Sequence, residues 1–197
     1  MTRPLAALVV LLAFGGCSAE QYFRPEPRPP GDEGEWAAVR DRATRTGKLY
    51  DGFGTNAFVK ATYLSLAVRE ARVARLATWT AMTPEERDRL LAGERAEAEE
   101  YDEFLVALFT PDRPANDLDA SHSVWRVALV VQGEGEELPQ RIVQVRQDVT
   151  LRALYPALDP FDTVYQVRFE RFRPPLAGRA FTLRLSGAKG LVDLGFD

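Results

Sequence analysis

Alternation of apolar and polar residues in the C-terminal third constrains the fold of this chain more than any other feature. Successive side chains of a β-strand point to opposite faces, so a period of two predicts strands with one buried and one exposed face. Turns that contain glycine separate several of these segments. The segments typical of strands are residues 125–131, 142–145, 165–170, 181–186 and 191–196. Together they predict an antiparallel sheet.

A helical hairpin is predicted ahead of these strands. Apolar residues recur at helical spacing from about residue 62 to residue 81. Thr83, Pro84 and Glu86 are then typical of a helix start, with a capping threonine, a proline at the first helical position and a glutamate that reaches back to the cap. The second helix is expected to run to about Phe109, so the hairpin would span about 62–109.

An extended segment at about 49–61 is predicted before the hairpin, and Asp51, Gly52 and Gly54 suggest a turn or bulge within it. Strands with one apolar and one polar face suit two packed sheets. We therefore expect a mainly β protein with some α structure. Its fold would be an antiparallel β-sandwich, with the immunoglobulin fold as a candidate topology and the helical hairpin inserted after the first strand.

The N-terminus has the pattern of an export signal. Arg3 is followed by ten residues, from Leu5 to Phe14, that are all apolar. As a helix these would reach about 15 Å, half of the ~30 Å hydrocarbon core of a bilayer, so the segment is too short to span a membrane. It matches the apolar region of a secretory signal peptide, which we expect at residues 1–16.

Small residues and a cysteine follow the apolar run, in the order Phe14-Gly15-Gly16-Cys17-Ser18. This segment resembles the lipobox of bacterial lipoproteins, with Phe14 where the family usually has leucine. The resemblance implies that lipid is attached to the Cys17 thiol, that the leader is cut before it, and that the lipid anchors the protein to a membrane. In that family, serine rather than aspartate at position 18 favours sorting to an outer membrane, facing the periplasm.

The domain organisation follows from what comes after the cysteine. Residues 18–34 are dense in proline and charge, a composition that favours extended polyproline II; the alternative is an ordered loop packed on the domain. Cys17 is the only cysteine, so no disulfide can form within the chain. We expect a signal peptide at 1–16, a lipidated cysteine and tether at 17–34, and a single domain at 35–197.

His122 is the only histidine, and it lies near Asp117, Asp119, Ser121 and Ser123. Two acids and an imidazole can contribute metal ligands, and a serine beside a histidine can suggest acyl transfer. However, the sequence lacks the spacing of a calcium loop, further ligands for zinc and a Gly-x-Ser-x-Gly motif. We therefore favour a polar loop that leads into the next strand, and we expect no metal, no cofactor and no catalytic residues.

Charged residues on the two predicted helices allow two interpretations. One is a docking surface for anionic headgroups near the anchor. The other is pairing across the hairpin on solvated faces, which contributes only tenths of a kcal/mol per pair. The net charge of −4 favours pairing, and it also argues against a nucleic-acid partner. The residues concerned are Arg69, Arg72 and Arg75 on the first helix and Glu94, Glu97, Glu100, Asp102 and Glu103 on the second.

Two loops, 155–161 and 171–175, combine aromatic residues, proline and charge. Such loops can carry the binding function of a sandwich, or they can cover the edge of its core. The leading functional hypothesis is a non-enzymatic envelope lipoprotein that binds or stabilises an envelope protein. The alternatives are an envelope hydrolase, which needs a cleft with perturbed acids, and a periplasmic carrier of a small apolar ligand or lipid, which needs an apolar cavity.

Overall fold

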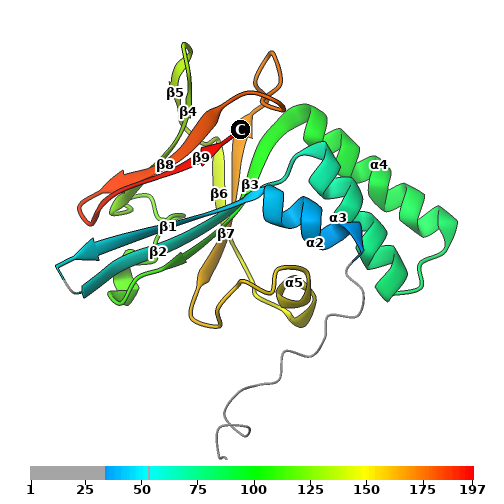
Figure 1. Ribbon diagram of the computed structural model, residues 1–197, viewed down its shortest axis with the longest axis horizontal. Helices are drawn as coiled ribbons and strands as arrows, with labels where there is room; N and C mark the ends of the chain where they lie inside the picture. Colours follow the sequence, from blue (N-terminus) through cyan, green and yellow to red (C-terminus); the bar gives the residue numbers. More distant parts are fainter. Residues whose placement is uncertain (1–33, 53) are drawn as a thin grey trace, which may run out of the picture. The chain divides into compact units, whose positions relative to one another are not determined.

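Two antiparallel sheets face each other in the computed structural model, which describes residues 34–52 and 54–197 (Figure 1). The predicted signal peptide, Cys17 and the predicted tether up to residue 33 lie outside the described residues. In hydrogen-bonded order, the first sheet contains β1 (Thr44–Asp51), β2 (Gly54–Tyr63), β3 (Tyr101–Phe109), β7 (Thr163–Glu170) and β6 (Arg141–Val145). The second contains β5 (Gly135–Glu137), β4 (Trp125–Val131), β8 (Phe181–Gly187) and β9 (Gly190–Phe196).

The inner faces of the two sheets form the main core. Phe104, Val106 and Leu108 of β3 share one buried cluster with Leu183 and Leu185 of β8. Along β8 and β9 buried residues alternate with more exposed ones, as the sequence pattern predicts. The expected antiparallel β-sandwich with a helical insertion is therefore confirmed.

Strand order separates this sandwich from the immunoglobulin candidate. The strands β1, β2 and β3 are neighbours in chain order within one sheet. In immunoglobulin domains the third strand belongs to the opposite sheet. The fold class is thus as expected, but the topology is a different one.

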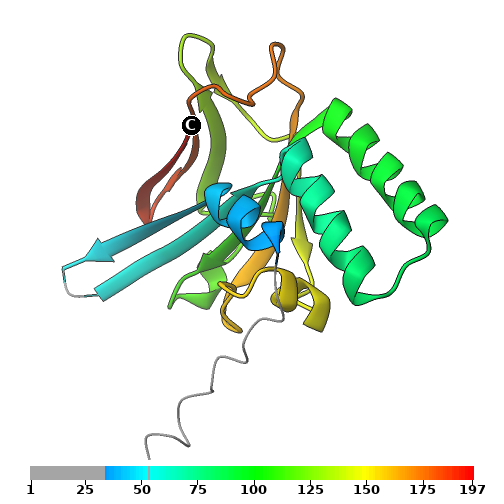
Figure 2. The ribbon, with the colours of Figure 1, turned by 45° about the vertical axis from the view of Figure 1, so that its right-hand side comes forward.

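Helices cover part of the outer face of the first sheet (Figures 1 and 2), and a second, smaller core lies between them and the sheet. Three helices contribute to it: α2 (Glu35–Arg42), α3 (Leu66–Trp79) and α5 (Val149–Leu154). Trp36 of α2 donates a 2.9 Å hydrogen bond from Nε1 to the carbonyl of Leu154, which joins α2 to α5. The apolar periodicity of the sequence predicts neither α2 nor α5, which are both short.

The helix α3 and the helix α4 (Pro84–Glu100) form the expected hairpin, which connects β2 to β3 (Figure 2). Ser65 caps α3 by accepting a hydrogen bond from the Val68 amide. At the start of α4, Thr83 and Glu86 make the reciprocal bonds of the predicted capping box. None of the helices in the described ranges is both long and apolar enough to cross a bilayer.

The predicted end of the second helix is wrong. α4 ends at Glu100, and residues 101–109, expected to be helical, form the central strand of the first sheet. The strand β3 is buried on both faces, so its apolar residues are not required to alternate. The chain passes from helix to strand at Tyr101, with φ of −130° and ψ of 146°, and no turn residue marks the boundary.

A β-hairpin takes the place of the single extended segment expected at 49–61. β1 and β2 pair antiparallel along their length, and Gly52 occupies the turn with φ of 57°. The predicted turn is thus confirmed, while the helical hairpin follows the second strand rather than the first. β1 also packs on β9, where the missing side chain of Gly47 leaves room for Val192.

Candidate functional site

The segment around His122 makes a structural connection into β4. Asp117 accepts hydrogen bonds from the Ser123 hydroxyl at 2.9 Å and from the Val124 amide at 3.1 Å. His122 itself is exposed. Within residues 34–52 and 54–197, no group of three or more His, Cys, Asp or Glu side chains could hold a metal ion. These contacts agree with the polar-loop interpretation of this segment.

Two arginines of α3 face the acids of α4. Arg69 is fully buried, and its Nη1 lies 2.7 Å from Glu94 and 3.2 Å from Glu97. Arg72 donates a 2.6 Å hydrogen bond to the same Glu94. Pairing across the hairpin is therefore confirmed for both arginines. Because Arg69 is buried, however, it is not on the solvated face that the sequence suggested.

Glu103, which was assigned to the acidic helix, instead lies buried on β3 and faces the helical hairpin. Its carboxylate accepts hydrogen bonds from Arg168 at 2.6 Å and from Gln166 at 2.8 Å, both on β7. Arg69 Nη2 lies 3.4 Å from the same carboxylate. A buried charge is tolerated when it is paired and hydrogen-bonded. Glu103 therefore ties the hairpin to the sheet.

Asp102, the preceding residue, is buried on the opposite side of β3. It accepts a 2.6 Å hydrogen bond from the Tyr63 hydroxyl and a 2.8 Å bond from the Phe172 amide, and it is paired with Arg171. All these groups belong to the protein itself, and their bonds to Asp102 hold the loop after β7 against the end of the sandwich. Sequence reasoning missed this role because it placed Asp102 on a helix.

Two buried tyrosines predict how stability depends on pH. Burial raises the pKa of Tyr165 to about 12, and burial together with the neighbouring Asp102 carboxylate raises the pKa of Tyr63. Unfolded tyrosine loses its proton near pH 10, so the unfolded state binds fewer protons than the folded state above that pH. We expect the contribution of these tyrosines to the free energy of unfolding to be complete below about pH 10 and to fall as the pH rises from 10 to 12. Urea unfolding at a series of pH values measures this, and Tyr165→Phe should reduce the fall; an equal fall in that variant would contradict the assignment.

Most aromatic residues in the two candidate loops cover the core. Tyr155 is buried, and its ring makes a T-shaped contact with Trp36 at 5.5 Å. Phe172 packs against the main core. Phe161 is the exception, because 70% of its surface is exposed. Tyr155 and Phe172 thus fit the interpretation that these loops cover the core, and Phe161 is the aromatic residue left exposed for binding.

The turn that carries Phe161 is fixed by hydrogen bonds. Asp162 accepts from the Asp159 amide at 2.8 Å and from Lys60 of β2 at 3.0 Å. Asp159 in turn accepts from the Phe161 amide at 2.9 Å. Gln147 donates to the Asp159 carbonyl at 3.2 Å. Because its backbone is held in this way, the turn presents an exposed aromatic side chain in a defined position.

Phe161 belongs to a larger aromatic surface, the aromatic strip, formed by Tyr50, Phe58, Phe109 and Phe161. The rings of Tyr50 and Phe58 are 6.3 Å apart, and those of Phe58 and Phe109 are stacked at 6.0 Å. Phe109 and Phe161 line one hollow of about 460 Å³. Tyr50 is 56% exposed, and Phe58 and Phe109 are partly exposed. The strip lies on the outer face of the first sheet, beyond the part that packs against the helices in the second, smaller core.

Two cationic side chains border the aromatic strip. The Lys48 ammonium lies 5.7 Å from the centre of the Phe58 ring, and Arg113 lines the hollow between Phe109 and Phe161. Among the described residues, neither Lys48 nor Arg113 forms an ion pair. The surface therefore combines apolar area with positive charge that is available to a binding partner.

Comparison with protein-family models, with curated proteins and with solved structures finds no match for this chain.

Proposed function

We propose that this chain is a lipid-anchored protein of the bacterial cell envelope that binds a partner protein through the aromatic strip, without enzymatic activity. One observation carries the proposal: aromatic side chains from β1, β2, β3 and the turn before β7 form one surface that none of the other described residues covers. Aromatic residues are enriched in the buried centres of protein interfaces and account for much of their binding energy.

The rigidity of the Phe161 turn supports the same proposal. Ordering a flexible loop during binding costs free energy, and a turn already fixed by Asp159 and Asp162 avoids much of that cost. The unpaired Lys48 and Arg113 add a requirement on the partner. Its surface should offer an apolar recess for the Phe161 ring and carboxylates near the cations.

The anchoring part of the proposal rests on the lipobox resemblance at Cys17. Lipid on that cysteine and a proline-rich tether would place the domain near a membrane, with an outer membrane facing the periplasm as the proposed location. Two or more acyl chains hold a protein firmly, whereas one binds only marginally. A membrane-bound position favours contact with a protein of the same envelope compartment.

Truncating Phe161 tests the partner-binding surface. We expect Phe161→Ala to weaken partner binding about 30-fold, which is the effect of removing a central aromatic worth about 2 kcal/mol. Because the ring is largely exposed, stability should change by no more than about 0.5 kcal/mol. The measurement uses a photo-crosslinking residue in place of the exposed Pro111, which lines the same hollow and leaves Arg113 intact, in producing cells, followed by isolation of the crosslinked species from the wild-type and variant proteins.

Leu191 provides a matched control on the other sheet. It is an apolar residue, 52% exposed on β9, and Leu191→Ala should leave crosslinking at position 111 unchanged. A crosslinker placed at position 191 should not capture the same species. The proposal would be contradicted if Phe161→Ala and Leu191→Ala gave equal yields, or if positions 111 and 191 captured the same proteins.

A further inference from the structure

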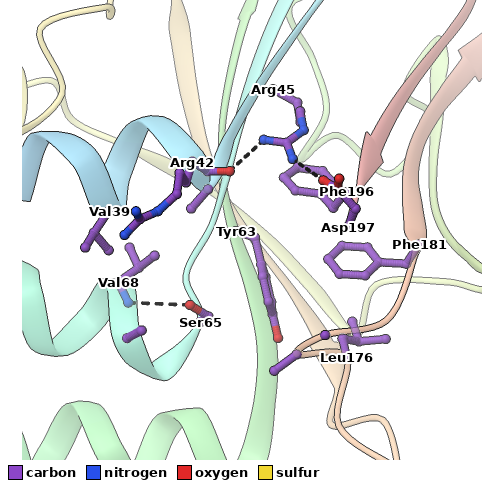
Figure 3. A pocket seen from close by; sticks show the side chains of 14 residues that line it. Val39, Arg42, Arg45, Tyr63, Ser65, Val68, Leu176, Phe181, Phe196 and Asp197 are labelled. Atoms are coloured by element: carbon purple, nitrogen blue, oxygen red, sulfur yellow. Dashed lines mark hydrogen bonds and ion pairs between the residues drawn. The ribbon is translucent and has the colours of Figure 1, made fainter.

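An open cavity of about 330 Å³, lined by apolar and polar side chains, lies where α2 and α3 meet the end of the second sheet (Figure 3). The rings of Phe181 and Phe196 are stacked at 5.1 Å on one side, and Tyr63 meets Phe181 edge-on at 5.2 Å. Val39 and Val68 line the opposite side from the helices. A dry cavity of ~150 Å³ can hold a benzene molecule, so this space is large enough for a longer hydrocarbon group.

The polar residues that line this cavity include two arginines in different states. Arg45 is already engaged, because it donates to the Asp197 carboxylate at 2.6 Å and to the Arg42 carbonyl at 2.6 Å. The Arg42 side chain is exposed and forms no ion pair or hydrogen bond with the described residues. Figure 3 shows its guanidinium beside Val39, next to the apolar lining. A free cation is therefore available beside an apolar space.

The start of α3 contributes to the same electrostatics. Ser65, Ala67 and Val68 all line the cavity, so the first turn of this helix faces it. The N-terminal end of a helix carries a partial positive charge, and α3 has no acidic residue in its first turn to offset it. An anionic group near Arg42 would thus meet two favourable interactions, and Arg45 partly offsets the charge of the Asp197 side chain.

We propose that this cavity binds a single-chain anionic amphiphile of the fatty-acid class. The hydrocarbon chain would lie against Phe181, Phe196 and Val68, and the carboxylate would pair with Arg42. The volume is at the lower end of the range for small-molecule sites, which suits one chain rather than the two chains of a phospholipid. None of the residues of the aromatic strip lines the cavity, so this site is independent of the proposed partner-binding surface.

Binding of dodecanoate to the full-length chain carrying Cys17→Ser tests the inference, because this variant cannot carry a lipid of its own. We expect saturable binding by isothermal titration calorimetry. Ala67 is exposed at the cavity, so Ala67→Phe should fill the space without disturbing the core and weaken binding more than tenfold. Equal affinity of the Ala67→Phe protein for dodecanoate would overturn the proposed site.

A charge reversal separates recognition of the ligand's carboxylate from recognition of its hydrocarbon chain. Arg42→Glu should weaken dodecanoate binding about tenfold and leave binding of the uncharged dodecanol unchanged. Arg89→Glu makes the same charge change at an exposed position of α4 and should leave both ligands unaffected. Equal weakening of dodecanoate binding by both charge reversals would overturn the role of Arg42 and, with it, the anionic class of the ligand.

Discussion

Replacing Arg69 with alanine is expected to lower the free energy of unfolding by about 3–5 kcal/mol, because it empties the space of a fully buried side chain and removes the charge that this side chain places among three acids. Arg69 is fully buried and contacts Glu94, Glu97 and Glu103. Glu103 would keep Arg168 as a charged partner, but it is 1% exposed, so water could not replace Arg69. Small domains are stable by only about 5–15 kcal/mol, and the variant should be close to unfolding. Urea denaturation monitored by tryptophan fluorescence measures the change.

Arg95 offers a matched control on the same helical hairpin. It also bridges α3 and α4, through a 2.7 Å contact with Glu70, but its side chain is 54% exposed. An exposed pair of this kind contributes about 0–1 kcal/mol, so Arg95→Ala should have little effect. If the two alanine variants lost similar stability, the buried network would not be the connection between hairpin and sheet that its geometry indicates.

Replacing Cys17 with alanine is expected to release the protein from membranes almost completely. The proposed anchor depends on a thiol that carries the lipid, and each buried methylene of an acyl chain contributes about 0.8 kcal/mol to membrane binding. Removing all acyl chains should therefore reduce membrane association far more than any substitution on the domain. Fractionation of cells, together with incorporation of labelled palmitate, measures the effect.

The neighbouring serine separates loss of the lipid from disturbance of the segment. Ser18→Ala leaves the thiol in place and should retain both labelling and membrane association. Continued palmitate labelling of the Cys17→Ala protein would place the lipid elsewhere or remove it from the proposal. A Cys17→Ala protein that loses its label but stays on membranes would point to the domain itself as the anchor.

The sequence predicts those parts of the fold where the local pattern agrees with the tertiary environment. In β8 and β9, one face meets the core and the other meets solvent, so apolar and polar residues alternate. At the start of α4, the capping groups lie within four residues of one another. In both cases the pattern that marks the element lies within a few neighbouring residues, even though β8 also pairs with the distant strand β4.

The strand β3 shows why the rest was not predictable. Its apolar residues fit a helical spacing, and its buried acids resemble the acidic face of α4. What makes it a strand is pairing with β2 on one side and β7 on the other, and both partners are distant in sequence. A run that is buried on two faces has no periodicity of its own to distinguish helix from strand.

The candidate site was predictable only in part for the same reason. The loop that contains Phe161 was recognised from its composition, but the other rings of the aromatic strip belong to three different strands. Phe58 and Phe109 become neighbours only through the register of β2 and β3, which pairs them directly. No local signal in the sequence shows which of the aromatic residues face outward at the uncovered end of the sheet.

The position of the helical hairpin has a consequence for the order of folding. When β2 pairs with β3, Tyr63 comes to lie opposite Phe104. If the residues between them were unstructured, closing this long loop would cost conformational entropy. Helices form within microseconds or less, and α3 and α4 contact each other closely in the native structure. A hairpin that forms early brings the two strand ends together before they pair, which shortens the effective loop. A helical connection between β2 and β3 would thus allow faster pairing than an unstructured connection of the same length.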